Sequence, residues 1–311
     1  MSEGMTRYVL GIDSGGTKYL VRAAAPDGRI LAEVRGAPCS HYQLGEEEAA
    51  RRIAAHLAAC VRQFGGRPED CLYLMCGTTG YDSPEDGELL HQLYRELVPC
   101  PVRVVNDVEL AFLVTCGSSG LVTLAGTGSI CYGRGPDGRE MRLGGWPRAV
   151  FGDEGSGRYI DALALRHYSR WLDGSRPESA FLREIRERTG IVTRKELMDY
   201  AVRMDTEGIT PGLGAAVTGA AEAGDPWAGA ILEDAAACLA RLAEEAAGCL
   251  GFAPGDALRA GIWGSVLINA APLRESFFRR LWETFPLAVP CMPEKDAVQG
   301  AVDLALEALT H

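Results

Sequence analysis

Gly11-Ile12-Asp13-Ser14-Gly15-Gly16-Thr17-Lys18 is the stretch on which the fold prediction rests, and it begins inside the apolar segment 8–12. Glycines that follow a strand let backbone N–H groups approach phosphate oxygens without an intervening side chain. Taken alone, Ser-Gly-Gly is equally well interpreted as an ordinary hairpin turn, and a solvated strand lysine is the simpler interpretation of Lys18. We expect Gly15, Gly16, Thr17 and Lys18 to contact phosphate, and Asp13 to bind Mg²⁺ through water.

The segments around this stretch predict a mixed α/β lobe. Apolar segments at 8–12, 19–25 and 30–34 are separated by turn residues, which indicates an antiparallel meander. Helical periodicity follows at 46–64 and 85–97, and short apolar strands are expected at 71–75 and 102–105. Strand, helix and strand in this order are typical of a parallel extension to the sheet.

A second unit repeats the opening pattern in outline. Apolar segments 121–124 and 130–133 flank a turn of small residues, and the chain is strongly helical from Ser156 onward. We therefore expect two lobes, residues 1–117 and 118–311. The terminal helix, about 297–309, is expected to pack back onto the first lobe.

Two further glycine-rich motifs end strands of this second unit. Leu124-Ala125-Gly126-Thr127-Gly128-Ser129 occupies the place that the first motif has in the first unit. Ala260-Gly261-Ile262-Trp263-Gly264-Ser265 follows a later strand; alone, it is better interpreted as a strand terminator. The nucleotide-binding residues expected here are Gly126, Thr127, Gly128, Gly264, Ser265 and Asn269.

In this order, the three motifs resemble the actin, hexokinase and heat-shock ATPase superfamily. Gly144-Gly145-Trp146 and Gly152-Asp153-Glu154-Gly155-Ser156-Gly157 resemble blocks of the BadF/BadG/BcrA/BcrD ATPase family and its N-acetylglucosamine kinases. The resemblance spans almost the whole chain. It implies two duplicated RNase-H-like lobes around a nucleotide cleft, ATP and Mg²⁺ as cofactors, and phosphorylation of an amino sugar.

The resemblance also assigns the acceptor side of the reaction. It implies that Asp107, directly after the strand 102–105, is the base that accepts the proton of the attacking sugar hydroxyl. An N-cap at the start of the next helix is the alternative role, and both can hold together. The sugar contacts expected are Ser40, His41, Asp107, Ser129, Gly145, Trp146 and Asp153. For Trp146, a place in the core is the alternative.

The chain departs from this family at two places. Ser40-His41-Tyr42 stands where its sugar kinases tend to have Asn-His-Trp, and Trp146-Pro147 stands where Trp-Gly is expected. An asparagine that would meet sugar hydroxyls is therefore absent, although Ser40 can still donate and accept a hydrogen bond. A surface serine is at least as good an interpretation of Ser40, and the sequence does not name the sugar.

Composition limits the partners and the compartment. The 42 acidic residues outnumber the 31 basic ones, giving a formal net charge of −11, which argues against binding to nucleic acid or an anionic membrane. The polar N-terminus lacks a signal-peptide core, so we expect a cytoplasmic protein. The ten cysteines show no Cys-x-x-Cys pair and are expected to be reduced core residues.

The function we expect is an ATP-dependent sugar kinase that acts as a homodimer on a small-molecule amino sugar. One alternative is an ATPase that activates a dehydratase or reductase, which would need cysteines for an iron–sulfur cluster between subunits. The other is a non-catalytic sugar sensor on the same fold. The presence of Asp13, Asp107, Thr127 and Asp153 favours catalysis.

Overall fold

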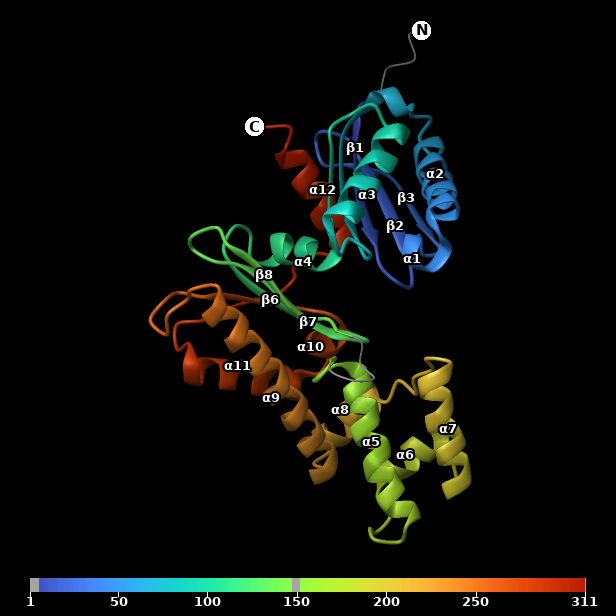
Figure 1. Cartoon of the computed structure of the whole chain (residues 1–311), viewed down its shortest axis with the longest axis vertical. Helices are drawn as coiled ribbons and strands as arrows, with labels where there is room; N and C mark the ends of the chain where they lie inside the picture. The colour runs from blue at the N-terminus through green and yellow to red at the C-terminus, as the bar shows by residue number, and fades with distance from the viewer. Residues whose placement is uncertain (1–5, 147–151, 311) are drawn as a thin grey trace. The chain divides into compact units, whose positions relative to one another are not determined.

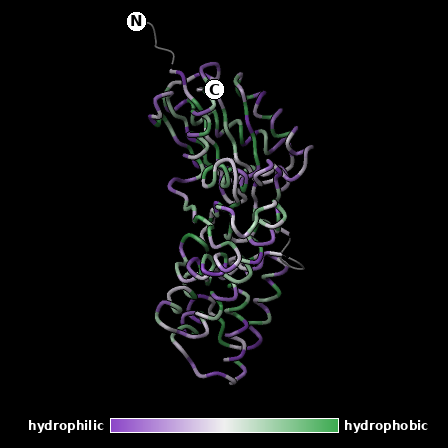
Figure 2. Tube along the Cα trace, turned by 90° about the vertical axis from the view of Figure 1, so that its left-hand side faces the viewer, coloured by the Kyte–Doolittle hydropathy of each residue, from purple (hydrophilic) through white to green (hydrophobic). Residues whose placement is uncertain are grey.

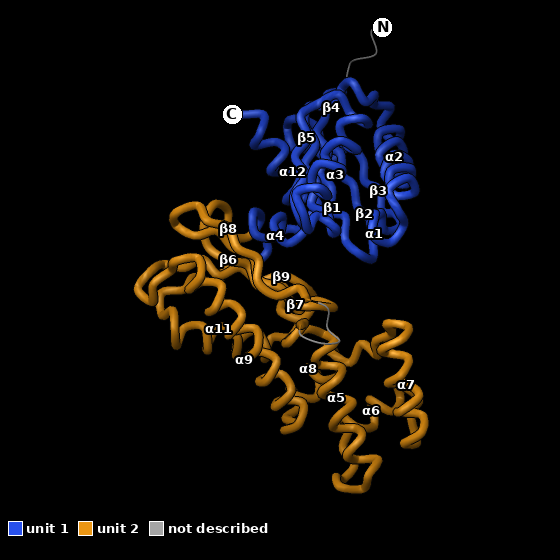
Figure 3. Tube along the Cα trace, viewed as in Figure 1, with its two compact units in different colours: residues 1–114, 293–311 blue, residues 115–292 orange. Residues whose placement is uncertain are grey.

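The computed structural model describes residues 6–146 and 152–310. It divides into two compact units: Met1–Val114 with Pro293–His311, and Thr115–Met292 (Figure 3). The division expected from sequence, at 117/118, differs by three residues, and it assigned residues 293–311 to the second lobe while expecting their helix to pack back onto the first. The terminal segment belongs to the first unit because its helix α12 (Ala297–Glu307) packs on the strands β1 and β4 of that unit.

The first unit is built on a mixed five-stranded sheet. Its strands are β1 (Tyr8–Ser14), β2 (Tyr19–Ala24), β3 (Ile30–Gly36), β4 (Cys71–Thr78) and β5 (Val102–Asn106), in the order β3-β2-β1-β4-β5 (Figure 1). The first three strands are antiparallel, whereas β4 and β5 run parallel to β1. The predicted meander and its parallel extension are both confirmed.

Helices cover both faces of this sheet. They are α1 (His41–Leu44), α2 (Glu46–Arg62), η1 (Pro68–Asp70), α3 (Pro84–Leu97), α4 (Asp107–Thr115) and α12. Ile53 of α2 joins the core on one face, and Val302 of α12 joins the core on the other. A Cβ added at Gly11 would lie 2.6 Å from the backbone nitrogen of Val302, so this glycine permits the close approach of α12 to β1.

The second unit repeats this sheet. Its strands are β6 (Gly120–Ala125), β7 (Ser129–Arg134), β8 (Glu140–Gly144), β9 (Arg259–Trp263) and β10 (Val289–Cys291), in the order β10-β9-β6-β7-β8. Again three antiparallel strands are extended by two parallel ones. The two sheets therefore share one topology, as the predicted duplicated fold requires.

Seven helices of the described second unit follow the strand meander or connect its last strands. They are α5 (Gly157–Leu172), α6 (Ala180–Thr189), α7 (Arg194–Thr206), α8 (Gly214–Glu222), α9 (Pro226–Cys249), α10 (Ser265–Asn269) and α11 (Ala271–Thr284). Hydrophobic and hydrophilic residues alternate along these helices (Figure 2). Alanines of α9 fill the core, and α9 packs closely on α11. The short α10 and β10 carry no periodic signal and were not predicted.

All ten cysteines are free thiols, and all but Cys100 and Cys249 are buried. The eight buried thiols fill core space, as expected, whereas the expectation is wrong for Cys249, which is exposed. In the described ranges, no helix is long and apolar enough to cross a membrane.

Candidate active site

The carboxyl ends of the three parallel strands of the first sheet bring polar residues to one edge. Ser14 of β1 lies opposite Thr78 of β4, and Thr78 lies opposite Asn106 of β5. Asp13 precedes this row, and Asp107 follows it as the first residue of α4. Ligands of open parallel sheets bind outside this edge of the strands.

The loop between β1 and β2 is a tight turn with an open outer side. The amide of Gly15 donates to the carbonyl of Lys18 at 3.0 Å. A Cβ added at Gly15 would meet nothing within 4 Å, and Gly16 and Thr17 are similarly open, with at most the tip of Gln43 near Gly16. Lys18 Nζ lies 2.8 Å from Asp13 Oδ2, so this lysine is paired rather than simply solvated. The hairpin therefore has room for an anion beside its backbone.

Asn106 fixes the junction between β5 and α4. Its Oδ1 accepts the amide of Val108 at 3.0 Å, and its Nδ2 donates to the carbonyl of Tyr81 at 3.0 Å. Asn106 thus caps an early amide of α4 through its side chain. The neighbouring half-buried Asp107 is held in place by this junction; its role as a base stays a prediction.

Ser40 and His41 lie at the start of α1, where Asp86 holds the segment. Ser40 is buried, His41 Nε2 lies 3.1 Å from Asp86 Oδ1, and Tyr42 donates to Asp86 Oδ2 at 2.8 Å. His41 Nδ1 is buried without a hydrogen-bond partner in the described part of the chain.

Asp86 is a carboxylate that the sequence analysis missed. Burial alone would raise its pKa, but hydrogen bonds from Ser83, Tyr42 and His41 outweigh it and lower the pKa to about 2. The spacing Ser83-x-x-Asp86 at the start of α3 is the sequence signal that was available, because Ser83 caps α3 and accepts the amide of Asp86.

In the second unit, the loop after β6 touches the start of α5. The amide of Gly126 donates to the carbonyl of Gly128 at 2.9 Å, and the amide of Gly157 donates to the carbonyl of Gly126 at 2.8 Å. A Cβ added at Gly126 would meet nothing within 4 Å. The outer side of this glycine loop is therefore open beside the amino end of α5, where the helix dipole favours an anion such as phosphate.

Gly264 ends β9 beside this loop. Its φ is +86°, and an added Cβ would lie 2.4 Å from the carbonyl oxygen of Ala125, so only glycine fits. The next residue, Ser265, begins α10. The third motif therefore requires glycine here, because its backbone lies very close to the backbone of the second motif.

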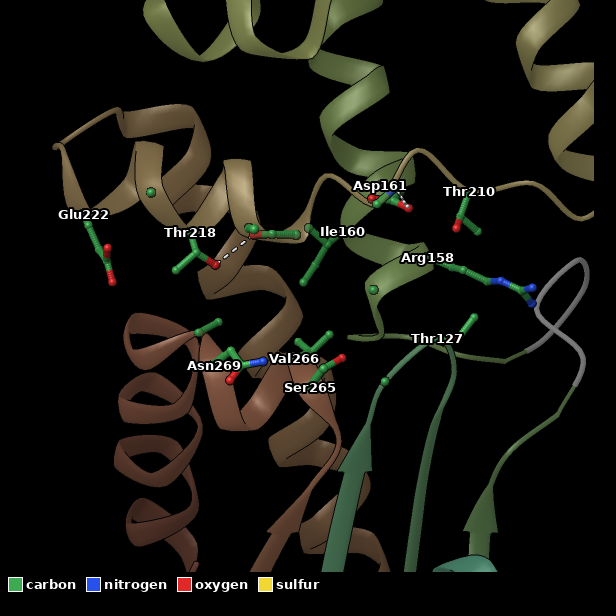
Figure 4. Close-up of a pocket in the computed structure, with 17 residues that line it drawn as sticks. Thr127, Arg158, Ile160, Asp161, Thr210, Thr218, Glu222, Ser265, Val266 and Asn269 are labelled. Atoms are coloured by element: carbon green, nitrogen blue, oxygen red, sulfur yellow. Dashed lines mark hydrogen bonds between the residues drawn. The ribbon is translucent and has the colours of Figure 1, made fainter. Parts of the chain in front are cut away.

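A cavity of about 480 Å³ lies within the second unit, beside the Gly126 loop and the start of α5 (Figure 4). Its lining comes from the loop after β6, the start of α5, the segment before α8, one face of α8, and α10. The predicted residues that it brings together are Gly126, Thr127, Ser265 and Asn269. Gly128 and Gly264 support its wall without lining it.

Sequence reasoning missed a buried carboxylate in this cavity. Asp161 of α5 is 2% exposed and accepts the amides of Gly212 and Leu213 at 3.2 and 2.6 Å. Burial raises the pKa of Asp161 above its usual value, and this effect outweighs the lowering by the two amides and by Arg158. Asp161 thus ties the segment before α8 to α5; this pairing of distant residues has no local sequence signal.

Asp153 combines an unusual backbone with a contact to the second glycine loop. Its φ is +67°, the only positive value for a non-glycine residue in the described ranges. Its Oδ1 accepts the amide of Ser129 at 2.9 Å, and the buried Ser129 hydroxyl donates to the carbonyl of Glu154 at 2.8 Å. These side chains fix the loop, and their contacts with a sugar stay a prediction.

Gly145 and Trp146 follow β8. Gly145 has a φ of +72° and donates its amide to the carbonyl of Ser129 at 2.9 Å. Trp146 is 62% exposed, so the alternative of a core aromatic is wrong. Pro147, where the chain departs from the sugar-kinase pattern, lies outside the described residues.

The model of the BadF/BadG/BcrA/BcrD ATPase family matches residues 10–305. The chain belongs to this family. A relative named N-acetylmuramic acid/N-acetylglucosamine kinase, from Clostridium acetobutylicum, is 31% identical over 199 residues. That alignment spans 63% of this chain and 65% of that kinase. N-acetyl-D-glucosamine kinase of Dictyostelium discoideum is 27% identical over 96% of this chain and 97% of its own.

Solved structures agree with this family assignment. One named as an N-acetylglucosamine kinase from Chromobacterium violaceum has a TM-score of 0.72 at 26% identity, covering 96% of this chain and 99% of that one. A ROK family glucokinase from Streptomyces griseus, solved with glucose and AMPPNP, has a TM-score of 0.57 at 19% identity, with 96% and 99% covered. The second likeness shows the shared fold alone. The first likeness, together with the repeated sheet topology, confirms the predicted α/β fold of two similar lobes.

Proposed function

We propose that this member of the family transfers the γ-phosphate of ATP to a hydroxyl, the 6-hydroxyl, of N-acetylglucosamine or a related amino sugar such as glucosamine. The observation that carries the proposal is the cavity of about 480 Å³ whose lining includes Gly126, Thr127 and the first residues of α5. Its size and its phosphate-binding end suit a nucleotide. The names of the relatives support the choice of sugar.

Phosphoryl transfer needs positioning and charge neutralisation more than covalent chemistry. In the proposal, Gly126, Thr127 and Gly128 bind phosphate oxygens, and Gly264, Ser265 and Asn269 border the nucleoside. The first-unit loop Gly15-Gly16-Thr17, with Lys18, contributes further phosphate contacts. Asp107 takes the proton of the sugar hydroxyl while the oxygen of that hydroxyl forms its bond to the γ-phosphorus and ADP leaves.

The residues present fit a nucleotide-bound Mg²⁺. This ion keeps several waters and is held by one or two carboxylates together with substrate phosphates. Asp13 supplies a carboxylate at the strand end beside the open Gly15 loop, and no cluster of three or more metal-ligating side chains occurs in the described residues. When bound, the ion would neutralise charge that develops on the phosphates, and Asp13 would orient its water shell.

For the sugar, we propose contacts from Asp107, Asp153, Gly145, Trp146, Ser129, Ser40 and His41. Asp153 retains a second carboxylate oxygen besides the one bound to Ser129, and the exposed face of Trp146 suits a pyranose ring. His41 is held by Asp86 through Nε2, so its other nitrogen faces a fixed direction. A homodimer and a cytoplasmic location complete the proposal.

The reaction is tested by identifying its product. Purified protein, ATP, Mg²⁺ and N-acetylglucosamine should yield a sugar whose mass has increased by one phosphate, with phosphorus coupling to the protons at carbon 6. Glucosamine and glucose serve as parallel substrates. ADP without a phosphorylated sugar would instead favour the activator ATPase, and nucleotide binding without turnover would favour a sensor.

A further inference from the structure

We propose that Glu222 is a nucleotide-specificity residue, whose carboxylate accepts a hydrogen bond from the nucleoside part of the bound nucleotide. The shared chemistry is a donor group: a ribose hydroxyl or the exocyclic amine of the base. This inference rests on the proposed use of ATP. The residue lines the cavity in which we place the nucleotide.

One face of α8 forms a wall of this cavity. Ala215, Thr218, Gly219 and Glu222 line it, and their spacing of three and four residues places them on a single helix face. A Cβ added at Gly219 would meet nothing within 4 Å. The small residues therefore leave room for a flat group to lie against the helix between the two polar side chains.

Both polar side chains on this face present hydrogen-bond acceptors. The Thr218 hydroxyl donates its proton to the carbonyl of Gly214 at 2.9 Å, so its lone pairs are what it offers to the cavity. The Glu222 carboxylate has no ion pair or hydrogen bond to other described residues. Two neighbouring acceptors select a ligand surface that carries donors.

The two ends of the cavity also differ in electrostatic character. The Gly126 loop and the amino end of α5, where the helix dipole favours an anion, line the end at which we place the phosphates. In the close-up view, Thr127 and Arg158 lie at one end, and Glu222 and Asn269 lie at the other (Figure 4). A carboxylate repels phosphate, so Glu222 can face only the nucleoside end of such a ligand.

Hydrogen bonds to a buried carboxylate hold the start of α8, the helix that carries Glu222. The buried Asp161 of α5 accepts the amides of Gly212 and Leu213, directly before α8 begins at Gly214. This contact links the helix at the phosphate end to the start of the helix that carries Thr218 and Glu222.

The test measures binding of nucleoside diphosphates to the full chain by calorimetry, which avoids turnover. ADP, 2′-deoxy-ADP, 3′-deoxy-ADP and inosine diphosphate are titrated into wild type, Glu222→Ala and Glu222→Gln. Glu187→Ala, which removes an exposed carboxylate outside the cavity, is the matched control for net charge. Thermal unfolding of each variant checks that it is folded.

We expect Glu222→Ala to weaken ADP binding about tenfold, with partial rescue by Glu222→Gln and no change in Glu187→Ala. The weakening should disappear for the one analogue that lacks the contacting donor, which separates the ribose hydroxyls from the base amine. ADP affinity within twofold of wild type, or equal weakening of ADP and all three analogues, would overturn the assignment. If wild type binds none of the diphosphates, the proposed function itself fails.

Discussion

Asp153 Oδ1 accepts the backbone amide of Ser129 at 2.9 Å, which joins the Gly-Asp-Glu-Gly-Ser block to the second glycine loop. The left-handed backbone of Asp153 places its carboxylate there, and a Cβ added at Gly128 would lie 2.3 Å from the same oxygen. Strained backbone of this kind gathers at functional sites. The contact lets one carboxylate support the phosphate loop and keep an oxygen for a ligand.

Two substitutions at Asp153 separate these roles. Asn tolerates a positive φ and retains an oxygen for the Ser129 amide. The free energy of unfolding of Asp153→Asn should therefore lie within about 1 kcal/mol of the wild-type value. Its KM for the sugar should rise about tenfold or more. Asp153→Ala loses the hydrogen bond to the Ser129 amide and keeps the strained backbone. Its free energy of unfolding in urea should therefore be about 1–3 kcal/mol lower than that of wild type. An unchanged sugar KM in Asp153→Asn would remove Asp153 from the sugar site.

Asp107→Asn should lower kcat at least about a hundredfold while ATP affinity stays close to wild type. The amide keeps the shape of the side chain at the start of α4 but cannot accept the hydroxyl proton. Single-turnover kinetics and nucleotide titration make the comparison. Turnover above about a hundredth of wild type would show that another group serves as the base.

Gly219→Leu should raise the KM for ATP about tenfold or more with little change in the KM for the sugar. The new side chain enters the cavity, where a Cβ at this position finds open space. The same change should stabilise α8 by about 0.5–1 kcal/mol, because leucine favours helix over glycine. Gly229→Leu in α9, another open helical position, is the control that should gain stability alone.

Asp86→Asn should destabilise the protein by about 1–2 kcal/mol near neutral pH, since the carboxylate accepts bonds from Tyr42, Ser83 and His41. The folded pKa of about 2 lies below the ordinary 3.8. The stabilisation is therefore complete above pH 3.8 and is lost as the pH falls through about 2.

Denaturant unfolding at several pH values checks the prediction for Asp86. The difference between wild type and Asp86→Asn should shrink as the pH is lowered from neutral toward 2. Glu85→Gln, also in the first turn of α3, controls for the helix dipole and should have a much smaller effect. A difference that is independent of pH would mean that the charge of Asp86 contributes nothing.

Much of the fold was predictable because its signals are local. The glycine turns at Gly15 and Gly126 and the alternation of apolar residues indicated the strands, and helical periodicity indicated α2, α3 and α9. The division into units was less accessible. The return of the terminal helix to the first lobe was expected from the family resemblance, but its contact with β1 depends on the missing side chain of Gly11, nearly 300 residues earlier.

The site was predictable where one short stretch carries the chemistry and hidden where distant residues cooperate. Thr127 and Ser265 could be named from glycine motifs, and the structure places both at one cavity. Asp161 was missed because its partner Gly212 lies 51 residues downstream. Asp86 has a local partner in Ser83, but nothing local shows its contact with His41, 45 residues upstream. Glu222 was missed because a single glutamate at the end of a helix has no distinguishing pattern.

ADP release with and without sugar distinguishes a sugar kinase from an ATPase that needs no sugar. The assay compares N-acetylglucosamine, glucosamine, N-acetylmuramic acid, glucose and a no-sugar control at saturating ATP and Mg²⁺. We expect ADP to form rapidly with at least one amino sugar and more than about tenfold more slowly without sugar, since transfer depends on a positioned acceptor. ADP release at the same rate in every arm, including the no-sugar control, would contradict this expectation.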